Sequence, residues 1–89
     1  MRKIALITGA TSGIGKACAI KFAQNNYDII ITGRRKERLE DLEKELRVFG
    51  ADVLSLNFDV RNNQEVEQYL GNLSGKWQDI DLLINNAGL

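Results

Sequence analysis

A glycine-rich segment near the start of the chain, TGATSGIG at residues 8–15, has the composition of a phosphate-binding loop. Gly9 permits a tight turn, Gly13 lets a phosphate approach the backbone without a Cβ, and Gly15 lets a following helix pack closely. The free amide groups at the start of that helix attract a pyrophosphate. A glycine-rich turn that binds nothing is the alternative, but the position between an apolar run and an Ala-rich helix pattern favours a nucleotide site.

Two arginines stand where a site of this kind selects its cofactor, at the end of the second apolar run. An acidic residue at that place bonds the ribose hydroxyls of NAD and repels a 2′-phosphate. The chain has Arg34 and Arg35 instead, with no carboxylate before Glu37. Guanidinium groups bind a phosphate through charge-assisted hydrogen bonds, so NADP is favoured over NAD. The alternative is a solvated first helical turn, although positive charge at a helix N-terminus is slightly unfavourable.

Polar residues also follow the third and fourth apolar runs. Asp59 can accept a hydrogen bond from an adenine amino group, and an Asx turn into the next helix explains it equally well. Asn86 and Gly88 are expected along the adenosine ribose, while Asn85 is expected to tie its loop to the sheet. Ligands of open α/β sheets lie at the carboxyl ends of the strands, which is where these residues are expected.

The elements that must bring these run ends together alternate along the chain. Short apolar runs bounded by turn residues predict buried strands at residues 4–7, 29–32, 53–58 and 81–84. Helix patterns separate them at residues 14–24, 36–49 and 64–74. The resulting order, β-α-β-α-β-α-β, predicts an α/β fold with parallel strands and right-handed crossovers.

The helix patterns carry their own start and stop signals. Leucines at spacings of three and four, followed by Phe49, form one apolar stripe in the second pattern, and Gly50 is a natural stop. In the third pattern, Asn62 is expected to cap the helix in a capping box with Glu65. Gly75 is expected to close that helix.

Composition narrows the function classes. The 89 residues suffice for one small domain, which we take as a single dinucleotide-binding unit over residues 1–89. The formal net charge of zero argues against a nucleic-acid partner. One cysteine permits no intrachain disulfide, histidine is absent, and no carboxylate spacing suggests a metal site. The apolar runs are too short for a signal-peptide core or a membrane span, so a reducing, cytoplasmic location is expected.

Three motifs together resemble one family. TGATSGIG at residues 8–15, DV at residues 59–60 and NNAG at residues 85–88, in that order and spacing, resemble the short-chain dehydrogenase/reductases. GRRKERL at residues 33–39 and WQDIDLLINNAGL at residues 77–89 look closest to the NADP-dependent 3-hydroxy acid or serine dehydrogenase branch.

The resemblance implies a partial Rossmann-type sheet of strand order 3-2-1-4 in a three-layer αβα arrangement, with NADP across its carboxyl edge. It implies hydride transfer between NADP and a secondary alcohol or ketone, such as a 3-hydroxy acid. The residues expected to bind the cofactor are Gly9, Thr11, Ser12, Gly13, Ile14, Gly15, Arg34, Arg35, Asp59, Val60, Asn86, Ala87 and Gly88.

The family's proton-transfer residues, a Ser, a Tyr-x-x-x-Lys pair and an Asn, lie beyond the equivalent of Leu89. No Tyr-x-x-x-Lys occurs in this chain, so we assign no catalytic residue. The alternatives are a non-catalytic NADP-binding module or sensor, an enzyme similar to 3-oxoacyl-carrier-protein reductase, and an assembly fragment that binds nothing. A small-molecule substrate and a homo-oligomer are expected for the whole enzyme. The fourth strand is expected to leave a bare edge through which isolated chains associate.

Overall fold

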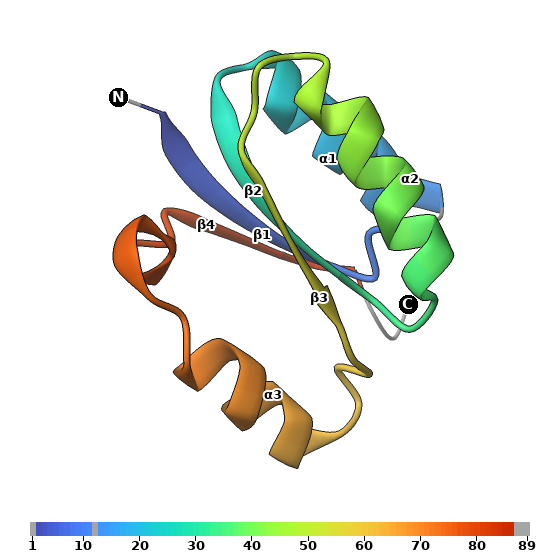
Figure 1. The fold of residues 1–89 in the computed structure, drawn as a ribbon, viewed down its shortest axis with the longest axis vertical. Coiled ribbons are helices and arrows are strands. Elements are labelled where there is room, and N and C mark those ends of the chain that lie inside the picture. The colour runs from blue at the N-terminus through green and yellow to red at the C-terminus, as the bar shows by residue number, and fades with distance from the viewer. Residues whose placement is uncertain (1, 12, 87–89) are drawn as a thin grey trace.

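The computed structural model describes residues 2–11 and 13–86, which form a four-stranded parallel sheet with helices on both faces (Figure 1). The strands are β1 (Lys3–Thr8), β2 (Tyr27–Gly33), β3 (Val53–Asn57) and β4 (Leu82–Asn85). The helices are α1 (Gly13–Gln24), α2 (Lys36–Arg47), α3 (Asn63–Gly71) and the short 3₁₀ helix η1 (Gly75–Gln78). The strand order is β3-β2-β1-β4, so the predicted fold class and strand order are confirmed.

The middle of each central strand is a continuous apolar run because both faces of the strand are covered. β1 pairs in parallel with β2 on one side and with β4 on the other, and β2 also pairs with β3. Successive side chains point to opposite faces, so Ile7 and Ile31 join one buried cluster while Leu6 and Ile30 join the other. This arrangement holds the carboxyl ends of β1 and β2 side by side.

The two layers of helix are unequal. α1 and α2 lie together over one face of the sheet, and α3 lies on the opposite side (Figure 1). The leucine stripe of α2 is fully buried against the first face. The second face is covered by partly buried residues that include Leu70, Leu73 and Trp77. None of the described helices is both long and apolar enough to cross a membrane.

The predicted end of the second helix is wrong by two residues. α2 ends at Arg47, and the amide of Gly50 donates to the Arg47 carbonyl at 3.0 Å. Gly50 has a φ of 83°, so the chain turns away here as a helix-stopping glycine allows. Phe49, which the apolar stripe placed inside, is 40% exposed because the turn rotates it out of the buried face.

The third helix confirms its predicted cap and corrects the rest. The Asn62 side chain accepts from the amides of Gln64 and Glu65, as an N-cap does. The reciprocal half of the capping box is absent, because the Asn62 amide already donates to the Asp59 carbonyl at 2.9 Å. The Glu65 carboxylate accepts from the Asp59 amide instead, at 3.1 Å. α3 ends at Gly71, and Gly75, with a φ of 59°, begins η1 rather than closing α3.

Candidate functional site

The glycine loop leaves β1 through a left-handed turn and is tied to the end of β2. Gly9 has a φ of 61°, a conformation that favours glycine. Its amide donates to the Thr32 hydroxyl at 3.4 Å, and the Ala10 amide donates to the Thr32 carbonyl at 3.0 Å. The first two amides of the loop therefore hold it in place and are not available to a ligand.

Gly13 and Gly15 occupy opposite environments, as the motif predicts. A Cβ on Gly15 would lie 2.4 Å from the Gly9 carbonyl oxygen and 2.6 Å from Nδ2 of Asn86, so only glycine fits between α1 and the loop. Gly13, with a φ of 57°, has no described atom within 4 Å of the same position. Ile14 beside it is 69% exposed. The start of α1 thus opens to solvent on the side where a phosphate would approach its amides.

The asparagines after β4 support this loop. Nδ2 of the Asn86 side chain donates to the Gly9 carbonyl at 3.1 Å, and the Asn86 backbone amide donates to the Thr8 hydroxyl at 3.0 Å. The Thr8 hydroxyl also donates to Oδ1 of Asn85 at 3.0 Å, so Asn85 ties its loop to β1 as expected. Asn86 also braces the glycine loop, and its contact with a ribose stays a prediction. Ser12, Ala87 and Gly88 lie outside the described residues.

The end of β2 lies directly against the glycine loop. A Cβ on Gly33 would lie 2.9 Å from Cγ2 of Thr11 and 3.3 Å from Cδ2 of Leu39, so this glycine permits the close approach. Arg34 and Arg35 follow it and are exposed. Arg35 is the N-cap of α2, in extended backbone and without a side-chain cap bond. The predicted cofactor-selecting arginines therefore stand next to the loop that is expected to hold the phosphates.

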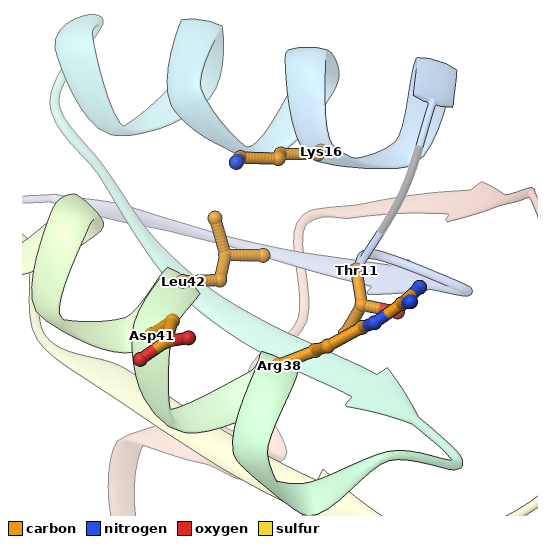
Figure 2. Close-up of a pocket in the computed structure, with 5 residues that line it drawn as sticks. All are labelled: Thr11, Lys16, Arg38, Asp41 and Leu42. Carbon is orange, nitrogen blue, oxygen red and sulfur yellow. The ribbon is translucent and has the colours of Figure 1, made fainter.

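A pocket of about 240 Å³ lies between the glycine loop and α2 (Figure 2). Its lining comprises Thr11, Lys16, Arg38, Asp41 and Leu42. Figure 2 shows the Arg38 side chain extending from the first turns of α2 toward Thr11. Arg38 is not among the candidate residues predicted from the sequence. Its position three residues after Arg35, on the same side of the helix start, was the available signal.

Asp59 follows the end of β3, and its carboxylate is hydrogen-bonded to Arg61. Oδ1 accepts from the Arg61 amide at 2.9 Å, which is the Asx turn left open by the sequence. The Arg61 guanidinium also contacts both carboxylate oxygens, at 2.9 Å from Nη2 to Oδ2 and 3.1 Å from Nε to Oδ1. Hydrogen bonds from the Arg61 guanidinium and amide, with a smaller contribution from the charge of Arg34, hold the pKa of Asp59 at about 2. Half-buried Val60 follows Asp59. The contact of Asp59 with adenine and that of Val60 with the cofactor stay predictions.

Comparison with known proteins decides the family. The sequence model of the short chain dehydrogenase family matches residues 3–89, nearly the whole chain. The chain belongs to the short-chain dehydrogenase family. The resemblance carried by the glycine loop, the Asp-Val pair and the Asn-Asn-Ala-Gly motif is thereby confirmed.

Curated and solved relatives agree with this assignment. The chain is 48% identical over 86 residues to the NADP-dependent 3-hydroxy acid dehydrogenase YdfG of Salmonella typhi, a match that covers 97% of this chain and 34% of that protein. It is similar to the closed form of serine dehydrogenase complexed with NADP⁺, at 44% identity and a TM-score of 0.86, covering 97% of this chain and 34% of that one. L-sorbose reductase from Gluconobacter frateurii, complexed with NADPH and L-sorbose, gives a TM-score of 0.91 at 35% identity, covering 99% of this chain and 34% of that one. The chain thus spans about a third of the length of these relatives.

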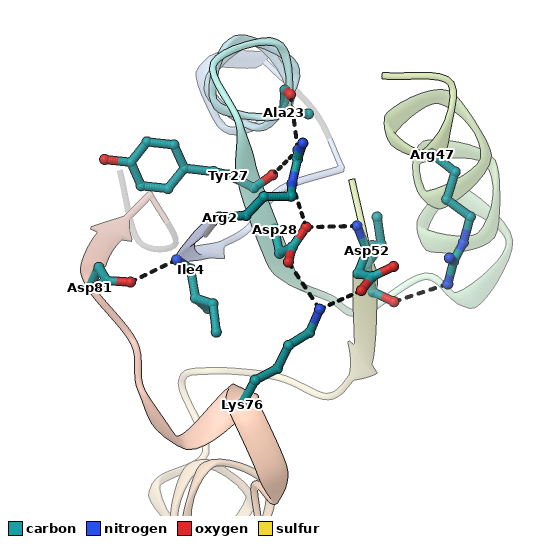
Figure 3. Close-up of polar contacts among 10 residues, drawn as sticks. Arg2, Ile4, Ala23, Tyr27, Asp28, Arg47, Asp52, Lys76 and Asp81 are labelled. Atoms are coloured by element: carbon teal, nitrogen blue, oxygen red, sulfur yellow. Dashed lines mark hydrogen bonds and ion pairs between the residues drawn. The ribbon is translucent and has the colours of Figure 1, made fainter. Parts of the chain in front are cut away.

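Another group of polar contacts surrounds Asp28 near the amino ends of the central strands (Figure 3). Asp28, at the start of β2, accepts from Nε of Arg2 at 2.7 Å, from Nζ of Lys76 at 2.9 Å and from the Asp52 amide at 2.9 Å. Lys76 also pairs with the Asp52 carboxylate. Burial raises the pKa of Asp28, but these hydrogen bonds outweigh it, so the pKa lies below the ordinary value of 3.8. The cluster ties η1 to β2 and β3 and takes no part in the candidate site.

Within residues 2–11 and 13–86, no group of three or more His, Cys, Asp or Glu is placed to hold a metal ion. The candidate site consists of backbone amides, hydroxyl groups, asparagine side chains and arginine side chains. These groups can bind and orient an anionic dinucleotide.

Proposed function

We propose that the chain is the NADP(H)-binding part of an oxidoreductase that transfers hydride between NADP and a secondary alcohol or ketone, such as a 3-hydroxy acid. The single observation that carries the proposal is the contrast between two glycines. Gly15 is packed so closely that no Cβ fits, whereas Gly13, in a left-handed conformation, faces open space at the start of α1. A loop that served only as a turn would not need an open face at the helix N-terminus.

Each part of the site has a proposed role toward the cofactor. The amides at the start of α1 bind the pyrophosphate, and Thr11 and Ser12 add hydroxyl donors. Arg34 and Arg35 bind the 2′-phosphate. The adenosine part of the cofactor is proposed to contact the residues that follow β3 and β4, namely Asp59, Val60, Asn86, Ala87 and Gly88. When bound, NADP supplies the hydride chemistry, and these residues hold and orient it.

The relatives support the choice of cofactor and substrate class. The named relatives are NADP-dependent dehydrogenases or are solved with NADP⁺ or NADPH. Their names point to 3-hydroxy acids, serine or L-sorbose as substrates. The first two carry a hydroxyl group, which in serine is a primary alcohol, and L-sorbose carries a ketone. Because the chain spans about a third of their length, activity and substrate belong to the whole protein. We also propose a homo-oligomeric, cytoplasmic enzyme.

Calorimetric titration of the protein with NADPH and with NADH tests the proposal. We expect NADPH to bind more tightly than NADH. Arg34→Asp is expected to weaken NADPH more than NADH, because it removes a cation from the 2′-phosphate and adds a repelling charge.

Lys21→Asp is the matched control. It makes the same charge change in the last turn of α1, at the far end of that helix from the glycine loop, and is expected to leave both affinities unchanged. No binding of either dinucleotide contradicts the proposal and favours an assembly fragment. Equal weakening of NADPH and NADH by Arg34→Asp removes the case for phosphate recognition.

A further inference from the structure

The pocket between the glycine loop and α2 is lined in part by the cationic side chain of Arg38, and the fold sets the position of that residue. Arg38 reaches from α2 toward Thr11 across this pocket (Figure 2). α2 cannot rotate, because its leucine stripe, from Leu39 on, is no more than 2% exposed against the sheet. Arg38, next to the buried Leu39, therefore lies at the rim of the pocket on the side of the loop, although its side chain is exposed.

The glycine loop is fixed on the other side of the same pocket. The Ala10 amide is bonded to the Thr32 carbonyl at 3.0 Å, which holds the loop on β2. The absent Cβ of Gly33 allows Thr11 to approach the end of β2 and α2 closely. Two rigid supports, the loop on β2 and the buried face of α2, thus set the width of the gap between Thr11 and Arg38.

Arg38 makes no ion pair with the described residues, whereas several other basic side chains do. Lys16 is paired with Glu45 at 3.6 Å, and Arg47 and Arg61 also have acidic partners. Among residues 2–11 and 13–86, no carboxylate lies within 4.0 Å of the Arg38 guanidinium, although Asp41 lines the same pocket. A guanidinium that has no acidic partner and faces a pocket is available to an anion.

We infer that Arg38 is a specificity-determining residue, which together with Arg34 grips the 2′-phosphate of NADP(H) in the gap between Thr11 and α2. The inference rests on the proposed function and adds a residue that is not among the cofactor-binding residues expected from the sequence. Arg34 approaches from the end of β2 and Arg38 from the first turns of α2. The phosphate is therefore held from two elements, and NADH, which lacks it, gains nothing from Arg38.

The test measures the dissociation constants of NADPH, NADH and 2′,5′-ADP in the intact protein. Arg38→Gln is expected to raise the constants for NADPH and 2′,5′-ADP by about 10- to 100-fold, the loss typical of a hydrogen bond to a charged group, and to leave NADH unchanged. Arg38→Lys keeps the charge without the planar fork, so it should recover part of the loss. Lys44→Gln removes a positive charge from an exposed position of the same helix and should change none of the three.

The outcomes separate this inference from the proposed function. If wild-type protein prefers NADPH and Arg38→Gln changes nothing, or weakens NADPH and NADH alike, the inference is overturned and the proposed function stands. If wild-type protein binds NADPH no better than NADH, the proposed function fails whatever Arg38 does. Circular dichroism checks that Arg38→Gln is folded. Should it unfold, Arg38→Lys decides, because a fork-dependent contact predicts selective loss of NADPH and 2′,5′-ADP, whereas unchanged binding overturns it.

Discussion

Alanine at Gly15 is expected to disrupt the glycine loop from within. The added Cβ would lie 2.4 Å from the Gly9 carbonyl oxygen and 2.6 Å from Nδ2 of Asn86. Both contacts are about 1 Å shorter than the ordinary separation of non-bonded atoms. The Gly9 oxygen cannot withdraw cheaply, since the backbone on either side is bonded to Thr32.

The magnitude follows from three contributions. Overpacking of this kind costs about 1–3 kcal/mol. Displacing the Asn86 side chain from the Gly9 carbonyl removes a hydrogen bond worth about 1 kcal/mol. Alanine returns roughly 1 kcal/mol through its better helix propensity. The free energy of unfolding should therefore fall by about 1–3 kcal/mol, and Tm by roughly 4–8 °C for each kcal/mol in a domain of this size.

Denaturant unfolding of Gly15→Ala and Gly71→Ala measures this difference. Gly71 is the matched control, because it also lies in a helix but has no described atom within 4 Å of its Cβ position. Its alanine variant should be as stable as wild type or up to about 1 kcal/mol more stable. Gly15→Ala should also weaken NADPH and NADH alike, since the loop serves both. If Gly15→Ala matched Gly71→Ala in stability and bound NADPH normally, the packing argument would be refuted.

Four further changes test other parts of the structure. The added Cβ of Gly13→Ala meets no described atom, so the φ of 57° alone should lower the free energy of unfolding by about 1–2 kcal/mol. Calorimetry should show a larger loss in the free energy of NADPH binding. Unaffected binding would contradict the proposed phosphate site at the start of α1. The lowered pKa of Asp28 means that its stabilisation is present above 3.8 and is lost as pH falls through the folded-state pKa. Asp28→Asn should cost about 1–3 kcal/mol at neutral pH and flatten the acid limb of stability against pH, and an unchanged limb would exclude the cluster as its cause. Arg61→Gln should raise the pKa of Asp59 from about 2 toward 3.8 in an NMR titration. An unchanged pKa of Asp59 would contradict the contribution of Arg61. Leu83, 58% exposed on an edge strand, should promote association of isolated chains, so Leu83→Glu should shift sedimentation toward monomer; clean monomer in both proteins would contradict this.

The sequence was sufficient for the features that burial dictates. Continuous apolar runs have one stable environment, a parallel sheet covered on both faces, so β1 and β2 were predictable within a few residues. The tight turn at Gly9 and the close packing at Gly15 were predictable for a similar reason, because each follows from a position relative to a strand end and a helix start. The role of Gly13 toward a phosphate stays a prediction.

Features decided by competition between neighbours were not predictable. Glu65 fits a capping box by spacing. The Asn62 backbone amide, however, donates to the Asp59 carbonyl, and the Glu65 carboxylate accepts from the Asp59 amide instead. Phe49 fits the apolar stripe, but α2 ends before it. Arg38 reads as one more charge on a solvated helix, and only the fold shows that Thr11 of the glycine loop lines the same pocket.

The central claim is that the start of α1 binds the pyrophosphate of NADPH on the open side of Gly13. Amide NMR spectra of the protein, recorded while NADPH is added, test this most directly. The account predicts that the amide resonances of Gly13 and Ile14 shift most, while the amides of Gly71 and its neighbours stay in place. Saturable NADPH binding that leaves the Gly13 and Ile14 amides unshifted would contradict it.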